Sequence, residues 1–194
     1  MTGSGRILTS KRLELVPMDL PLLRALADGD WARAEAVADL HVPRDIELKA
    51  SAIVRRIHQL EEDASLLPWL MHAMVLRESR TMCGRIGFHS SPGPADLTTV
   101  APGGVELGYE VDPRFRRQGY AKEAAVTLMK WAFDSVDQRW FVLSISPTNS
   151  ASLAMAASLG FKEFGSQMDE EDGLELYFRR RLDAWPAEWA FAAG

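Results

Sequence analysis

The order of hydrophobic and polar residues along the chain changes period several times, from that of strands to that of helices. Apolar and charged residues alternate over residues 12–16, which is typical of a strand buried on one face. Over residues 47–63 apolar residues return every three or four positions, which predicts an amphipathic helix. Residues 140–146 form an apolar run rich in aromatic and β-branched residues, which predicts a buried strand.

The same criteria divide most of the chain into short elements. They predict helices over 19–27, 31–40, 122–133 and 149–160, and strands over 69–77, 82–89, 105–111, 164–168 and 175–180. Turn residues separate these elements, and a Ser-, Pro- and Gly-rich loop covers residues 90–104. Such a succession indicates an α+β protein, but it does not fix the order of the strands in a sheet.

The junction after the strand at 105–111 carries the clearest chemical signal. A basic loop leads to Gly119 and Ala121 and then to a long helix pattern. Backbone N–H groups and the dipole at a helix N-terminus favour anions. Glycine lets a ligand approach the main chain closely. The junction therefore predicts a diphosphate cradle, with a solvated basic helix start as the alternative.

Neither of the common nucleotide loops, G-x-x-x-x-G-K-[ST] and G-x-G-x-x-G, is present at this junction. The residues found there are Arg116-x-x-Gly119-x-Ala121. A second motif, Asn149-x-x-Ser152, follows the strand at 140–146 and opens a helix that ends with Leu-Gly-Phe. Asparagine is a favoured N-cap, so this motif alone also fits an ordinary capped helix. A third segment near the N-terminus reads LTSKRLELVP.

Together these motifs resemble the GCN5-related N-acetyltransferase (GNAT) superfamily. The first matches its [RQ]-x-x-G-x-[GA] coenzyme A signature, and the second matches its N-x-x-S signature. The N-terminal segment and the run ELGYEV at 106–111 are similar to the branch that contains the ribosomal-protein N-terminal acetyltransferases. The resemblance spans about residues 6–180 and implies one acetyltransferase domain over residues 1–194.

The fold that this resemblance implies is a GNAT-type mixed, mainly antiparallel sheet flanked by helices. The family's fourth and fifth strands part into a V, and here they are residues 105–111 and 140–146. The resemblance further implies that acetyl-CoA is the acyl donor and lies in this V. The expected cofactor-binding residues are Tyr109, Val111, Arg116, Arg117, Gln118, Gly119, Tyr120, Ala121, Asn149 and Ser152.

Acetyl transfer to an amine requires the amine to be neutral when it attacks, and a carboxylate can take the proton directly or through water. Glu106 is the first candidate base, because family members often carry a carboxylate near this point, and Glu110 is the second. Strand alternation places both on one face of the sheet unless a bulge intervenes. The alternative for each is a solvated strand glutamate.

Many relatives place a tyrosine on the helix after the fifth strand, where it protonates the thiolate. Ala156 stands at that position here, and no tyrosine lies between Tyr120 and Tyr177. A tyrosine acid is therefore not expected. By resemblance to the ribosomal branch, Ser152 is predicted to hydrogen-bond the thiol instead. The alternative is a serine that only serves the first helical turn.

Composition narrows the classes of partner. The 194 residues carry a net charge of -5, which disfavours general nucleic-acid binding. The lone Cys83 and the histidines without metal-ligand spacing predict no metal site. The sequence has no signal-like N-terminus and no long uncharged apolar run, so the cytoplasm is the expected location. A monomer or a homodimer is expected. The acidic run at 168–172 is either a solvated turn or an attraction for a cationic acceptor. The aromatic tail at 185–191 should pack on its own domain or on a partner.

The leading hypothesis is an acetyl-CoA-dependent N-acetyltransferase in which a primary amine attacks directly in a ternary complex. The amine acceptor is open, and protein N-termini, aminoglycosides, polyamines and amino acids all remain candidates. The alternative is a non-catalytic module of the same fold that binds or senses acyl-CoA. A phosphate-binding domain for another nucleotide is a third hypothesis, which the second and third motifs disfavour.

Overall fold

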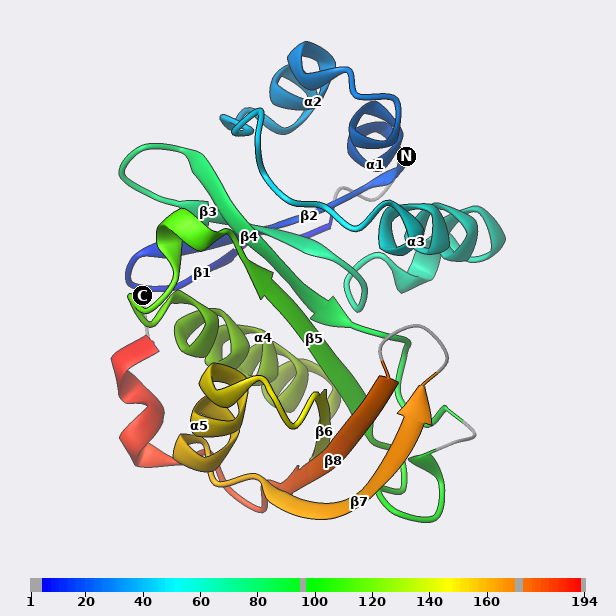
Figure 1. Ribbon diagram of the computed structural model, residues 1–194, viewed down its shortest axis with the longest axis vertical. Helices are drawn as coiled ribbons and strands as arrows, with labels where there is room; N and C mark the ends of the chain where they lie inside the picture. The colour runs from blue at the N-terminus through cyan, green and yellow to red at the C-terminus, as the bar shows by residue number, and fades with distance from the viewer. Residues whose placement is uncertain (1–4, 95–96, 170–172, 193–194) are drawn as a thin grey trace.

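The computed structural model of the chain describes residues 5–94, 97–169 and 173–192, and within these residues eight strands form one sheet (Figure 1). The strand order is β1-β2-β3-β4-β5-β6-β8-β7. The strands are β1 (Leu8–Thr9), β2 (Leu13–Pro17), β3 (His72–Leu76), β4 (Thr81–Phe88), β5 (Val105–Val111), β6 (Trp140–Ile145), β7 (Lys162–Asp169) and β8 (Gly173–Arg181). The α-helices are α1 (Leu20–Ala27), α2 (Trp31–Ala38), α3 (Ala50–Glu62), α4 (Tyr120–Val136) and α5 (Ser150–Ser158).

Helices cover both faces of the sheet. Alternate residues of β2 and β3 point to opposite sides, because side chains alternate along a strand. Leu15 and Met74 are fully buried in the cluster that contains α4, whereas Val16 and Val75 belong to the cluster that contains α1, α2 and α3. Figure 1 shows the same layers, with α1–α3 on one side of the strands and α4 on the other. The two apolar clusters therefore meet across the sheet.

The sheet splits between β5 and β6. These strands are parallel, and they pair only through Val105 with Phe141 and Glu106 with Val142. Every other strand pair among the described residues is antiparallel. Beyond Glu106, β5 continues to Val111 with β4 on one side and no strand on the other. The predicted mixed sheet with a V between these two strands is confirmed.

The predicted elements are found, with differences at their ends. The helix predicted over 122–133 is α4 and runs over Tyr120–Val136, where Asp137 takes a left-handed conformation and caps it. The strand predicted over 69–77 begins only at His72, because Trp69 and Leu70 close turns onto Leu66. The two-residue strand β1 is too short to give a periodic pattern. Part of the acidic run, residues 170–172, lies outside the described residues.

The aromatic tail packs on its own chain. Trp189 is 2% exposed, and the Arg180 guanidinium lies 4.5 Å from the centre of its ring. Trp185 contacts Phe133 of α4 with ring centroids 5.6 Å apart. The first of the two expected locations, its own domain, therefore holds for these residues.

In the described part of the chain, no helix is both long and apolar enough to cross a membrane. No group of three or more His, Cys, Asp or Glu residues in that part is arranged to hold a metal ion.

His72 makes stability depend on pH. The residue is 1% exposed, and its Nδ1 lies 3.0 Å from the Leu70 carbonyl oxygen. Burial lowers its pKa from 6.5 to about 4, and the hydrogen bond to Leu70 partly offsets this effect. The folded pKa is depressed, so the stability from neutral His72 is complete above the unfolded pKa and is lost as the pH falls toward 4. We expect this residue to lower the free energy of unfolding by about 2 kcal/mol at pH 5 relative to pH 8.

Urea unfolding of wild type and His72→Gln at both pH values measures this contribution. The variant should show a smaller loss of stability between pH 8 and pH 5, and the exposed His58→Gln should behave like wild type. Equal losses in wild type and His72→Gln would contradict the assignment.

Candidate active site

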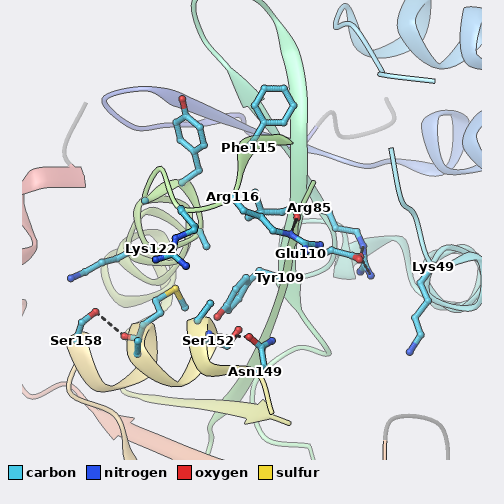
Figure 2. A pocket seen from close by; sticks show the side chains of 18 residues that line it. Lys49, Arg85, Tyr109, Glu110, Phe115, Arg116, Lys122, Asn149, Ser152 and Ser158 are labelled. Atoms are coloured by element: carbon cyan, nitrogen blue, oxygen red, sulfur yellow. Dashed lines mark hydrogen bonds and ion pairs between the residues drawn. The ribbon is translucent and has the colours of Figure 1, made fainter. Parts of the chain in front are cut away.

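A pocket of about 1040 Å³ lies where β5 parts from β6 (Figure 2). Its walls come from the end of β5, the loop that follows it, the start of α4 and one side of α5. The residues that line it are Lys49, Arg85, Tyr109, Glu110, Val111, Phe115, Arg116, Arg117, Gly119, Tyr120, Ala121, Lys122, Asn149, Ala151, Ser152, Ala154, Met155 and Ser158.

The loop after β5 is shaped by Asp112. Its buried carboxylate accepts hydrogen bonds from the backbone N–H of Arg114 (3.0 Å) and from the guanidinium of the same residue (2.8 and 2.9 Å). These bonds to Arg114 hold the pKa of Asp112 below its ordinary value, against the opposing effect of burial. Arg114 also pairs with Asp45 at 2.8 Å. This arginine is therefore committed to the loop, which leaves Arg116 and Arg117 on the pocket wall.

Gly119 is the N-cap residue of α4 and has a left-handed backbone, with φ of 82°. Arg117, two residues earlier, is also left-handed, with φ of 62°. Alternating backbone of this kind turns successive N–H groups toward one side and forms an anion-binding concavity. Gly119 has no side chain to cap the N-terminus of α4, and no side-chain cap is found there among the described residues. The free N–H groups of a 17-residue helix therefore begin at the pocket wall.

A buried carboxylate ties this loop to the N-terminal strands. Glu123 of α4 is 2% exposed and accepts hydrogen bonds from the Ser10 hydroxyl (2.8 Å), the Arg12 backbone N–H (2.7 Å) and the Arg12 Nε (2.7 Å). Arg12 then donates from Nη1 to the Gln118 carbonyl oxygen at 3.0 Å. Its guanidinium lies 4.5 Å from the Tyr120 ring centre. Arg12 of the N-terminal motif thus stabilises the loop between β5 and α4 through its contacts with Gln118 and Tyr120.

The pocket is electropositive although the chain is acidic overall. Its lining includes five cationic side chains, Lys49, Arg85, Arg116, Arg117 and Lys122, and one carboxylate, Glu110. The chain as a whole has a net charge of -5. A concentration of positive charge around free helix N–H groups favours a ligand with several negative charges.

The cations lie on both sides of β5. Figure 2 shows Lys49 on one side of the strand, and Arg116, Lys122 and Ser152 on the other. The pocket reaches both sides because β6 no longer accompanies β5 at this level. The pocket therefore extends along α4 and α5 and also reaches the side of β5 where Lys49 lies.

Tyr109 projects from β5 toward α5, where Ser152 lies (Figure 2). Its hydroxyl oxygen is buried and makes no hydrogen bond with the described residues. Burial raises the pKa of this phenol, and the nearby Ser152 lowers it by a smaller amount. A buried donor without a partner is costly, so this hydroxyl is available to a polar group in the pocket.

Helix α5 begins at the pocket. Asn149 caps it by accepting the Ser152 N–H at 3.1 Å. Asn149 and Ser152 both line the pocket. Ala156, where many relatives carry the tyrosine, is fully buried in the apolar core.

The two candidate glutamates have different surroundings. Glu110 lines the pocket and pairs with Arg85, whose Nε and Nη2 lie 3.0 and 2.7 Å from its Oε2. Glu106 is not among the lining residues; it accepts a hydrogen bond from the Ser144 hydroxyl, and its Oε1 lies 3.4 Å from Nδ1 of His89. The β4–β5 register is unbroken, so both glutamates share a face of the sheet as predicted.

Residues 12–162 of the chain match the acetyltransferase (GNAT) domain family. The chain belongs to the GNAT acetyltransferase family. Among curated proteins, the uncharacterized N-acetyltransferase YnaD of Bacillus subtilis is 24% identical over 165 residues, which cover 81% of this chain and 84% of YnaD.

Solved structures of acetyltransferases share the fold. A ribosomal-protein-alanine acetyltransferase from Vibrio fischeri superposes with a TM-score of 0.64 at 14% identity, covering 93% of this chain and 99% of that one. The ribosomal-protein acetyltransferase RimL, in complex with coenzyme A, gives a TM-score of 0.62 at 19% identity, covering 92% and 99%. At these identities the similarity concerns the fold, and the predicted family and architecture are confirmed.

The structure of this GNAT family member brings most of the predicted site residues together in the pocket lining and leaves two outside it. Gln118 is absent from the pocket lining and contributes its carbonyl oxygen to Arg12. Glu106 lies behind the lining, beside His89. Sequence reasoning did not single out Lys49, Arg85 or Lys122, which belong to separate segments and carry no local motif.

Proposed function

We propose that this acetyltransferase moves an acetyl group from acetyl-CoA to a primary amine, with both substrates bound in the cleft between β5 and β6. The observation that carries the proposal is the electropositive pocket in which uncapped α4 N–H groups meet the free edge of β5. The same fold holds coenzyme A in RimL, and an acetyltransferase named MccE holds acetyl-CoA and AMP. We further propose that residues 1–194 act as one domain, which the continuous sheet from β1 to β7 supports.

The proposed cofactor positions follow the predicted residues. The N–H groups of Arg117 to Ala121 would receive the diphosphate, and the side chains of Arg116, Arg117 and Lys122 would neutralise phosphate charge. The free edge of β5 at Tyr109 and Val111 offers backbone groups to the pantetheine amides. Arg116 already donates from Nε to the Val111 carbonyl oxygen at 2.9 Å, which fixes this arginine beside the edge.

At the thiol end the chain supplies hydroxyl groups. Ser152 and Tyr109 face each other there, and the buried phenol has no other hydrogen-bond partner among the described residues. Acetyl-CoA supplies an activated acyl group whose leaving group is a thiolate. One or both hydroxyls would stabilise the charge that develops on sulfur. The sequence predicted Tyr109 as a cofactor-binding residue, but strand position alone does not reveal that its phenol points toward Ser152.

The acceptor would approach from the side of α3, where Lys49, Arg85 and Glu110 line the pocket. Glu110 is already paired with Arg85, so it is a weak candidate for taking the amine proton. The relatives named for ribosomal proteins act on protein substrates, and a protein N-terminus is one acceptor class to test here. Aminoglycosides, polyamines and amino acids complete the panel.

The alternative is a non-catalytic acyl-CoA-binding module, which the buried Ala156 in place of tyrosine favours. Calorimetric titration with acetyl-CoA tests binding, and free-thiol release with the amine panel tests turnover. Binding with amine-dependent thiol release supports the enzyme. Binding without release from any amine supports the module, and displacement of CoA by ATP or NAD contradicts both.

Ser152→Ala is expected to lower the rate of acetyl transfer about tenfold, the scale of one lost hydrogen bond to a developing charge. The matched control is Ser150→Ala on the exposed first turn of the same helix, which should keep the wild-type rate. Kinetics and thermal melts of both variants distinguish the outcomes. Wild-type turnover in Ser152→Ala would contradict a role in transfer and leave this serine with only a structural role in the first turn of α5.

A further inference from the structure

His89 and Glu106 form a pair beside β5, next to the residues that line the pocket. His89 follows β4 directly, and its backbone N–H donates to the Glu106 carbonyl oxygen at 2.9 Å, so the two residues lie opposite each other. The side chains meet as well, with Nδ1 of His89 3.4 Å from Oε1 of Glu106. The pair lies on the face of the sheet that also carries Glu110 of β5 and its cross-strand partner Arg85 of β4.

The carboxylate of the pair is enclosed, and the imidazole is not. The Glu106 side chain is 17% exposed, whereas that of His89 is 47% exposed. Burial tends to raise the pKa of Glu106, but His89, Ser144 and Arg56 together lower it below the ordinary value. Glu106 is therefore ionised near neutral pH, and its Oε1 is already engaged by two partners.

The second nitrogen of His89 is seated over a glycine. A Cβ atom on Gly108 would lie 2.5 Å from Nε2 of His89, so the imidazole can occupy this position only because residue 108 is glycine. Gly108 immediately precedes Tyr109, which lines the pocket. Nε2 makes no hydrogen bond with the described residues. It thus lies beside the strand segment that forms the cleft wall.

The backbone of His89 is also held from α3. Its carbonyl oxygen accepts from the Gln59 amide at 3.1 Å and from Arg56 Nη1 at 3.4 Å. Arg56 is 8% exposed and lies close enough to Glu106 to stabilise its charge. The charged groups around the imidazole are therefore Glu106 on β5 and Arg56 on α3, with the Arg85–Glu110 pair further along the same face.

We propose that His89, rather than Glu106, takes the proton from the attacking amine, and that Glu106 is the positioning residue for the imidazole. This inference rests on the proposed function. Nδ1–H donates to the Glu106 carboxylate, which leaves the lone pair of Nε2 free, the arrangement of a histidine base held by an acid. The amine nitrogen forms a bond to the acetyl carbon as the carbon–sulfur bond breaks. The amine proton passes to Nε2, and the electron pair leaves on sulfur.

Three variants and one control test the assignment on an acceptor that wild type acetylates. We expect His89→Ala to lower kcat/KM about a hundredfold, the lower range for a positioned base. Acetyl-CoA affinity should stay unchanged. Added imidazole should restore part of the rate to His89→Ala. Glu106→Gln should be slowed but not rescued, and Gly108→Ala, which displaces the ring, should be slowed with its cofactor affinity retained. His58→Ala, an exposed histidine on α3, should match wild type.

The pH profile gives a second readout. The acidic limb of kcat/KM in wild type should contain one ionisation that His89→Ala lacks. If His89→Ala stays within about threefold of wild type while Glu106→Gln is slow, Glu106 acts directly and the inference is wrong. A slow His89→Ala that keeps the acidic limb and gains nothing from imidazole would make the histidine structural. If wild type releases no CoA with any amine, the proposed function itself fails.

Discussion

Gly119→Asp is expected to weaken acetyl-CoA binding by at least about a hundredfold, which corresponds to about 2.7 kcal/mol. Gly119 stands at the N-cap of α4, where the proposed diphosphate site meets the free N–H groups of the helix. A carboxylate there places like charge against the phosphates and fills the approach to the main chain. Like charges brought together in a binding site cost several kcal/mol.

Gly119→Asn is the matched control, because it has the same shape without the charge. Both asparagine and aspartate tolerate a left-handed backbone. A Cβ at this position meets only the Nη2 atom of Arg12, at 3.5 Å, so either variant should fold. Calorimetry should rank affinity as wild type, then Asn, then Asp. A well-folded Gly119→Asp with wild-type affinity would place the diphosphate elsewhere.

Glu123→Ala is expected to lower the free energy of unfolding by about 3 kcal/mol, the lower end of the cost of breaking a buried ion pair. The Glu123 side chain is 3% exposed, and its removal leaves the Ser10 hydroxyl and the Arg12 backbone N–H without their acceptor. Arg12 itself is 42% exposed and can turn to solvent, which limits the loss. Urea unfolding of wild type and variant measures the change.

Glu123→Gln keeps one acceptor oxygen and the side-chain volume, so it should cost clearly less than Glu123→Ala. The alanine variant should also bind acetyl-CoA several-fold more weakly, because Arg12 would lose the partner that orients it toward the Gln118 carbonyl oxygen. If the free energy of unfolding of Glu123→Ala is within about 1 kcal/mol of the wild-type value, the Arg12–Glu123 pair contributes no more than a surface ion pair.

Local motifs were enough to predict most of the residues that line the pocket along α4 and α5, where the cofactor is proposed to bind. Gly119 has a left-handed backbone and Asn149 caps α5. Both are local requirements that can be recognised from a few consecutive residues. The split between β5 and β6 came from the resemblance to the family, since propensity does not reveal which strands part.

The contacts on the proposed acceptor side could not be predicted in the same way. His89 and Glu106 are separated by 17 positions and meet only through the β4–β5 register. Arg12 and Glu123, 111 positions apart, meet through the packing of α4 on β2. Such contacts depend on the tertiary arrangement, and no short pattern records them. Strand alternation did place Glu106 and Glu110 on one face, but it could not show that different partners hold them.

The parting of β5 and β6 also divides the sheet into two groups of strands that are joined by few backbone pairs. Within the described residues, only Val105 and Glu106 join the ladder of β1–β5 to that of β6–β8. A ligand whose amides pair with the free edge of β5 acts as an added strand and links the β1–β5 ladder to the β6–β8 ladder. Cooperative local unfolding of β6–β8 should then become rarer when a ligand fills the cleft. Slower amide exchange in β7, on the outer edge and without a residue in the pocket lining, would report cofactor binding at a distance.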